Sequence, residues 1–144
     1  MKPTSCFKKA FLTVAMAATF LLLGSCAKKV AFLTSSVVPA ARGSVKVTKD
    51  NNSNYVLKIQ LSNLAESSRL QPAKESYVVW IAADGATTKN MGQIKSGTHL
   101  MSKNLTAAFE SVSAFKPTKV FITAEDDPAA QYPSALVVLT TDSF

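Results

Sequence analysis

The sequence is poor in the residues from which most enzyme and metal sites are built. It holds two cysteines and one histidine in 144 residues. Two cysteines exclude a disulfide-dense scaffold and a structural zinc site made of cysteines. The single histidine, His99, excludes most histidine-based metal sites and leaves histidine-dependent catalysis one candidate. The length suits one ordinary domain with one hydrophobic core, because two full domains would be cramped.

Acidic residues are also few. Nine Asp and Glu side chains stand against 16 Lys and Arg, which gives a formal charge of +7. A basic balance of this kind raises nucleic acids and anionic membranes as partners. The lysines, however, are scattered, with no arginine-rich stretch and no cluster interleaved with aromatic residues. We therefore expect no nucleic-acid binding.

The first 25 residues are typical of a signal peptide for export. Three lysines among the first nine residues precede Ala10–Leu23, a run of 14 residues without a charge. A membrane-spanning helix needs about 20 apolar residues, so this run is too short to be one. The next residues, Gly24-Ser25-Cys26, complete with Leu23 a tetrapeptide that resembles the lipobox of bacterial lipoproteins. The resemblance implies cleavage between Ser25 and Cys26 and attachment of fatty acyl chains, such as palmitate, at Cys26.

The residues after Cys26 indicate in which membrane the lipidated protein is expected to lie. Ala27, Lys28 and Lys29 stand where some lipoproteins carry acidic signals for inner-membrane retention or surface export. Without such a signal, we expect the outer membrane of the cell envelope, with the protein facing the periplasm. We also expect the two lysines to lie against anionic headgroups, each contributing about 1 kcal/mol.

The rest of the chain divides at Gly43. Residues 26–42 mix small, hydroxyl-bearing and basic residues, and predict a lipidated tether with a first short strand at 30–33. From Gly43 to residue 144 the apolar residues recur with a period of two, which is the signature of strands. The predicted strands span 43–49, 55–61, 76–83, 89–94, 104–109, 119–125 and 135–140.

This pattern predicts the fold class. About seven short strands, spaced by about a dozen residues and without a helical stripe, are typical of an antiparallel, immunoglobulin-like β-sandwich. The strand at 76–83 is apolar on both faces, so we expect it to be central. Trp80 and Phe121 are the expected large side chains of the core. Trp80 could instead stack on a carbohydrate, but a position in such a strand favours the core.

The order of several strand and turn residues carries a resemblance. The matching pieces are Leu61-Ser62-Asn63-Leu64, Tyr77–Ile81, Ala83-Asp84-Gly85, Met91–Ile94, Phe121–Glu125, Pro133 and Leu136–Leu139. This order is similar to the extracytoplasmic domain of the anti-sigma-K factor family, over residues 55–140. The family's double glycine is replaced by Asp126-Asp127, and its cytoplasmic zinc-binding domain and transmembrane helix have no counterpart in the sequence. The resemblance therefore implies a stand-alone lipoprotein version of the sensor-side β-sandwich.

The densest acidic group is Glu125, Asp126 and Asp127, in a loop between two predicted strands. Carboxylate oxygens are ligands that Ca²⁺ prefers, but the spacing does not match the calcium-loop pattern. The sequence favours a solvated loop. A small calcium-binding protein, or a carbohydrate-acting one with paired carboxylates, is the alternative.

The sequence contains no recognisable catalytic constellation. His99 lacks the serine and acid of a triad and the second histidine of a metal motif, so we expect a solvated loop residue. The sequence therefore predicts a noncatalytic, lipid-anchored envelope protein with no cofactor. We expect it to bind an envelope protein or a glycan through its loops or sheet edges.

Overall fold

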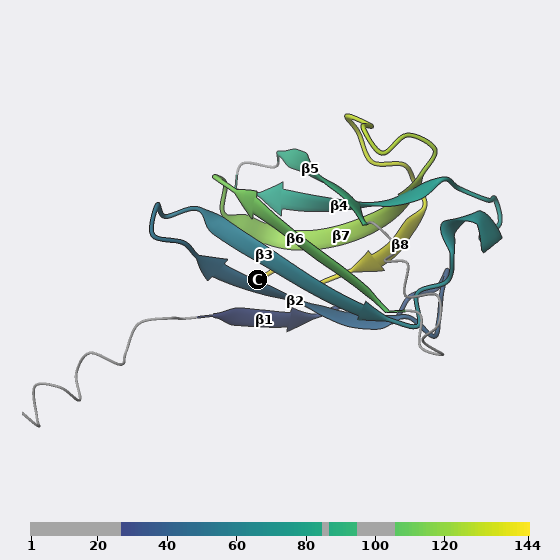
Figure 1. The fold of residues 1–144 in the computed structure, drawn as a ribbon, viewed down its shortest axis with the longest axis horizontal. Coiled ribbons are helices and arrows are strands. Elements are labelled where there is room, and N and C mark those ends of the chain that lie inside the picture. Colours follow the sequence, from purple (N-terminus) through teal and green to yellow (C-terminus); the bar gives the residue numbers. More distant parts are fainter. Residues whose placement is uncertain (1–26, 85–86, 95–105) are drawn as a thin grey trace, which may run out of the picture.

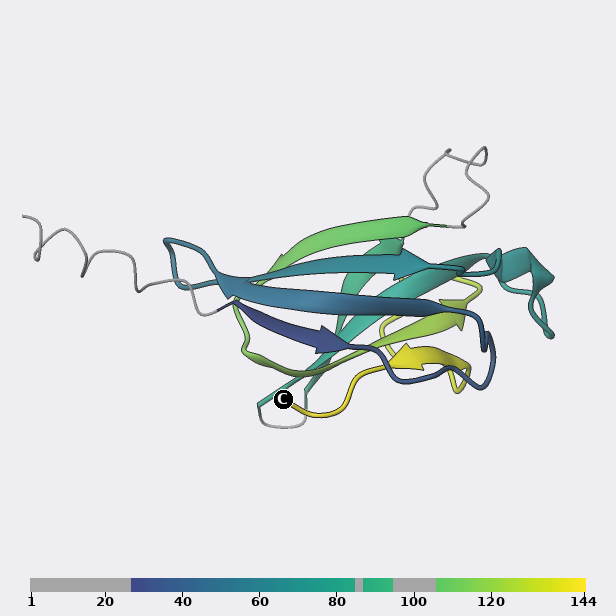
Figure 2. The ribbon, with the colours of Figure 1, turned by 90° about the horizontal axis from the view of Figure 1, so that it is seen from below.

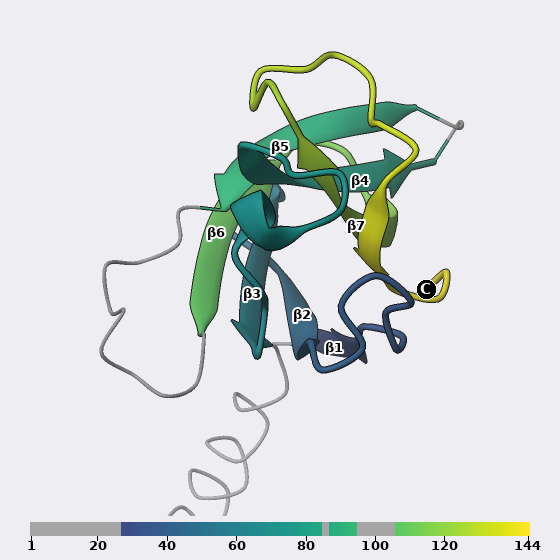
Figure 3. The same ribbon diagram turned by 90° about the vertical axis from the view of Figure 1, so that its right-hand side faces the viewer.

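The strands form two antiparallel sheets that pack face to face (Figures 1 and 3). The computed structural model describes residues 27–84, 87–94 and 106–144. The first sheet has the order β1-β2-β3-β6 and the second β5-β4-β7-β8. The strands are β1 Lys28–Ala31, β2 Arg42–Lys49, β3 Tyr55–Ser62, β4 Ser76–Ala83, β5 Thr88–Ile94, β6 Ala107–Ser113, β7 Pro117–Glu125 and β8 Val137–Thr140. The predicted antiparallel, immunoglobulin-like β-sandwich is confirmed, with eight strands in the described residues rather than about seven.

The β2–β3 hairpin forms as its alternating pattern predicts. Val45 pairs with Ile59 and both are buried, whereas their neighbours Lys46 and Lys58 pair on the exposed face. In the connecting turn, the carboxylate of Asp50 accepts hydrogen bonds from the Asn54 side-chain amide at 3.1 Å and from two backbone amides at 2.8 Å. These hydrogen bonds, that of the Asn54 side chain foremost, lower the pKa of Asp50.

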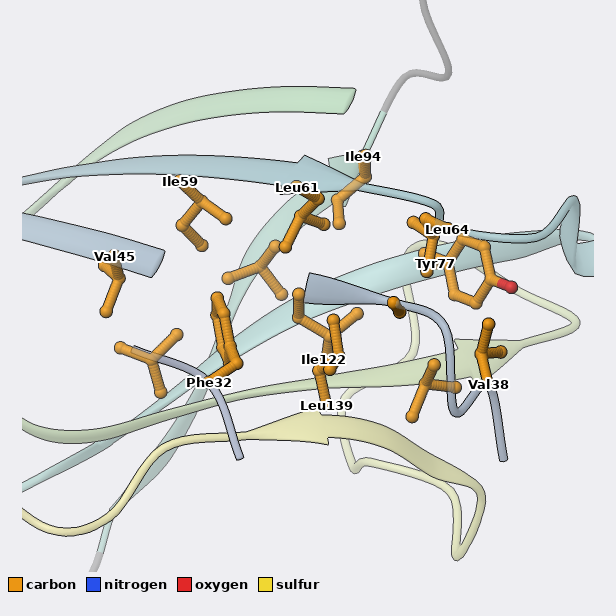
Figure 4. Packing of buried hydrophobic residues seen from close by; sticks show 14 of the residues in the cluster. Phe32, Val38, Val45, Ile59, Leu61, Leu64, Tyr77, Ile94, Ile122 and Leu139 are labelled. Atoms are coloured by element: carbon orange, nitrogen blue, oxygen red, sulfur yellow. The ribbon is translucent and has the colours of Figure 1, made fainter. Parts of the chain in front are cut away.

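The hydrophobic core lies between the two sheets (Figure 4). Each strand of the hairpin contributes alternate residues, and β4 and β7 contribute Tyr77, Val79, Ile81, Val120 and Ile122 from the facing sheet. All buried members of the core cluster lie between Phe32 and Leu139. The segment 27–144 therefore contains the core cluster of the described residues and all the described strands, so we expect it to fold as a unit.

The first segment of the sandwich corrects the predicted tether. Residues 28–31 form β1, which pairs with the middle of β2, and Phe32, Val38 and Ala41 are buried in the core. Phe32 also bridges to Thr141, and the Leu33 amide donates to the Thr140 carbonyl at 2.8 Å. The apolar residues of this short segment fill one open side of the sandwich, so the packed domain begins near Lys28 and not at residue 43.

The sixth strand is also displaced from its prediction. The period-two pattern predicts a strand at 104–109, whereas β6 runs from Ala107 to Ser113. Its register against β3 continues through Glu110, which pairs with Lys58, to Ser113, which pairs with Tyr55. Because β6 pairs with β3 as far as Tyr55, β6 extends beyond the apolar residues on which the prediction was based. Residues 104 and 105 lie outside the described residues.

Tyr77 provides a test of core packing at high pH. Its hydroxyl donates to the Ala65 carbonyl at 2.8 Å, and burial raises the pKa of Tyr77 to about 12. An unfolded tyrosine titrates near pH 10. The folded state keeps the Tyr77 proton to a higher pH than the unfolded state does. The contribution of Tyr77 to the free energy of unfolding is therefore complete below pH ~10 and is lost between about pH 10 and 12. We expect the free energy of unfolding, measured with denaturant, to fall across this window.

The variant Tyr77→Phe should remove that part of the pH dependence, because phenylalanine cannot ionise. Tyr132→Phe is the matched control, since the Tyr132 side chain is 82% exposed and its loss should leave the profile unchanged. An identical alkaline slope in wild type and Tyr77→Phe would show that another group causes it.

Candidate functional site

A chain of buried polar groups fixes the base of the loop that joins β7 to β8. The indole Nε1 of Trp80 donates to Thr123 Oγ1 at 2.8 Å, and the Thr123 hydroxyl donates in turn to Glu125 Oε1. The same carboxylate oxygen accepts from the Ser134 amide at 2.8 Å. All three side chains are buried, with Trp80 and Thr123 fully inaccessible. Residues 126–136, which we call the 126–136 loop, are thus held at both ends by one carboxylate.

Trp80 is buried as predicted, but not between the sheets. Its β4 neighbours Val79 and Ile81 belong to the core cluster, whereas Trp80 points to the opposite face of the second sheet. There its ring stacks with that of Phe121, with centroids 6.4 Å apart. The 126–136 loop arches over this side of the sheet (Figure 3). Trp80 is therefore a large buried side chain, as predicted, but it lies outside the cluster between the sheets. The prediction for Phe121 is wrong, because its side chain is only partly buried.

A second attachment comes from a bulge in β5. The pairing of β4 with β5 shifts between Val79 and Trp80, and Gly92 takes a positive φ of 121° there. The bulge turns Asn90 toward the loop, where its amide nitrogen donates to the carbonyls of Pro128 and Ala130 at 3.0 and 2.9 Å. The Asn90 carbonyl oxygen accepts from Gly92 N at 2.8 Å. The nitrogen of this side chain thus holds the loop, while its oxygen holds the bulge.

The three predicted acidic residues each have a separate structural partner. Glu125 belongs to the buried chain above, and Asp126 forms an ion pair with Lys74 at 2.6 Å. Asp127 accepts a hydrogen bond from the Ala129 amide at 2.8 Å and so shapes the loop. Among the described residues, no group of three histidine, cysteine or acidic side chains lies close enough to hold a metal ion. The three carboxylates are thus engaged separately within the protein.

The outer part of the 126–136 loop presents a tyrosine that the sequence reasoning missed. The Tyr132 side chain is 82% exposed, on a segment that contains Pro128 and Pro133. A large aromatic side chain on a fixed loop is a typical anchor in binding surfaces, because little conformational freedom is lost on binding. A tyrosine placed between two prolines in a polar loop is the signal from which it could have been inferred.

A hollow lies beside the other end of this loop. It has a volume of about 490 Å³ and an apolar lining with one charged side chain, Arg69. Its lining residues are Val37, Val38, Pro39, Ala40, Ala65, Arg69, Leu70, Gln71 and Leu136. Leu136 ends the 126–136 loop, so the hollow and the loop form neighbouring parts of one end of the sandwich. We call this combination the loop surface.

Several predicted residues lie outside the described residues, namely His99, Ser25 and Cys26. In the part of the chain that the structure describes, no helix has the length and apolar character needed to span a bilayer. No family model matches the chain, and neither a curated protein nor a solved structure matches it. The 126–136 loop is thus fixed by hydrogen bonds within the chain, and Tyr132 remains exposed on it.

Proposed function

We propose that this chain is a noncatalytic, lipid-anchored protein of the bacterial cell envelope whose β-sandwich binds a protein or glycan partner. Cys26 carries the lipid in this proposal, and the outer membrane is the site of attachment, with the domain in the periplasm. The proposal treats the chain as a stand-alone form of the sensor-side sandwich of anti-sigma-K factors. The order of residues quoted from the sequence supports that relationship.

The observation that supports the binding role is that the loop surface has a fixed base and an exposed aromatic side chain. Its base is held by Glu125 and Asn90 through four hydrogen bonds to the loop or to Thr123, all below 3.1 Å. Its outer part exposes Tyr132 almost fully. A loop fixed in this way loses little entropy when a partner binds, so its exposed aromatic can contribute most of its contact energy to affinity.

Photocrosslinking in intact envelopes tests this role. A photoreactive phenylalanine analogue placed at position 132 of the full chain should yield a discrete adduct with one partner. The same analogue at Gln60, an exposed residue of β3 on the other sheet, is the matched control and should yield none. Mass spectrometry and glycan staining of the adduct then distinguish a protein from a glycan. Equal adducts from both positions, or none from position 132, would contradict the proposed binding surface.

A further inference from the structure

The end of the sandwich where β1 begins carries three lysine–aromatic pairs. This end also holds the β2–β3 turn and the C-terminal residues (Figures 1 and 2). We call it the basic end. Lys28 lies 5.3 Å from the ring centre of Phe144, Lys49 lies 5.2 Å from that of Tyr55, and Lys89 lies 4.1 Å from that of Phe115. Aromatic rings beside lysines with long apolar stems are suited to the boundary between water and lipid headgroups.

Three lysines of this end converge on one groove. The groove has a volume of about 300 Å³ and a mainly apolar floor. Its lining residues are Lys28, Val47, Thr48, Lys49, Tyr55, Lys116, Pro117 and Phe144. A groove with an apolar floor and ammonium groups around it is complementary to a phosphate headgroup and the first carbons of its acyl chains.

Few of these positive charges are neutralised within the protein. In the described ranges, no carboxylate lies within 4.0 Å of the Lys28 or Lys49 amines, whereas Lys116 lies 4.0 Å from Asp84. That pair is largely exposed and so contributes little. Asp50, in the neighbouring turn, is hydrogen-bonded by the neutral Asn54 amide and keeps its negative charge. The four lysines named at this end, Lys28, Lys49, Lys89 and Lys116, outnumber the two carboxylates named here, Asp50 and Asp84.

The proposed lipid anchor would place this end against the bilayer. Cys26 precedes Lys28, the first residue of β1, by two positions. Two residues span at most about 7 Å when fully extended. This distance is within the Debye length of about 8 Å at physiological ionic strength, so bilayer charge is only partly screened there.

We infer that the basic end is a docking surface for anionic phospholipid headgroups, which holds the sandwich upright on the membrane. This inference rests on the proposed lipidation for its biological setting. Each lysine near an anionic surface contributes about 1 kcal/mol, so the surface alone binds weakly. The anchor makes this contact intramolecular, and at the resulting effective concentration weak attraction is enough to fix the orientation.

Vesicle co-sedimentation of the unlipidated 27–144 segment tests the surface independently of the anchor. At low ionic strength, we expect binding to vesicles of phosphatidylcholine and phosphatidylglycerol, and far weaker binding to phosphatidylcholine alone. The double variant Lys49→Gln/Lys116→Gln should weaken binding about 30-fold, from about 1 kcal/mol per lysine. The variant Lys46→Gln/Lys58→Gln removes the same charge from the exposed face of β2 and β3 and should have a much smaller effect.

The outcomes separate this inference from the proposed function. Equal losses in the two double variants would overturn the docking surface in favour of nonspecific charge attraction. Equal binding to neutral vesicles would also overturn it. Displacement by millimolar glycerol phosphate would indicate a site for a soluble phosphate compound instead of a membrane surface. None of these results depends on whether Cys26 is acylated, which a separate labelling experiment decides.

Discussion

The variant Thr123→Val is expected to lower the free energy of unfolding by about 2–4 kcal/mol. Valine keeps the shape of threonine but removes the hydroxyl that links the Trp80 indole to the Glu125 carboxylate. The variant leaves a fully buried N–H without an acceptor, and a buried carboxylate that retains only the Ser134 amide. A missing partner in a buried network costs more than an average hydrogen bond contributes.

Denaturant unfolding followed by tryptophan fluorescence measures this loss directly. Trp80 is the only tryptophan in the sequence, so its emission reports on the network itself. Thr123→Ser is the matched control, because it keeps the hydroxyl and removes one methyl group, at a cost of about 1 kcal/mol. A valine variant as stable as the serine variant would mean that the hydroxyl does not hold the network together.

The second large effect concerns Cys26. Metabolic labelling with an alkyne fatty acid should label the wild-type protein, and Cys26→Ser should abolish the label. The physical reason is that a thiol is needed to accept the lipid, and a hydroxyl is a much weaker nucleophile. Stable anchoring takes more than one acyl chain, because one chain gives only marginal, reversible binding. Mass spectrometry of the wild-type protein should therefore show several acyl chains on a chain that begins at Cys26.

Cys6 provides an internal control for this experiment. It is the only other cysteine, and the proposed cleavage discards it with the signal peptide. Cys6→Ser should therefore retain full labelling. Label that survives in Cys26→Ser, or a wild-type chain that still begins at Met1, would refute the lipoprotein proposal while leaving the loop surface to be tested separately.

The fold could be predicted largely from period-two alternation, because that pattern reflects burial of one strand face. It located the β2–β3 hairpin and β4 closely, since their apolar residues alternate or run together between turn-forming residues. It placed β6 too early because the pairing partner, and not the apolar pattern, determines where a strand ends. It assigned Phe32 to a tether, because a short apolar patch does not reveal that Phe32 bridges to Thr141, far along the chain.

The candidate site was less accessible from sequence because its contacts join residues far apart in the chain. The apolar run around Trp80 indicated that both faces of β4 are covered. It could not show that the 126–136 loop lies over the outer face of β4. Nor could it show that Thr123 accepts the indole hydrogen bond and donates in turn to Glu125. Glu125 drew attention as a possible calcium ligand, whereas its buried carboxylate holds the loop. For Tyr132, the only sequence feature that indicated exposure was its position between two prolines in a polar loop.

If Cys26 is lipidated as proposed, the short connection between Cys26 and β1 would limit how far the domain reaches from the membrane. With lipid on Cys26, about 7 Å of chain precedes a sandwich whose eight-residue strands are about 26 Å long. The loop surface, at the opposite end from β1's first residue, would then stand roughly 35 Å above the bilayer. A lipoprotein on a long flexible tether can search a wide shell of the envelope, whereas the proposed anchor would confine this domain to a thin layer. If the chain is lipidated as proposed, we expect its partner to lie in, or close to, the same membrane.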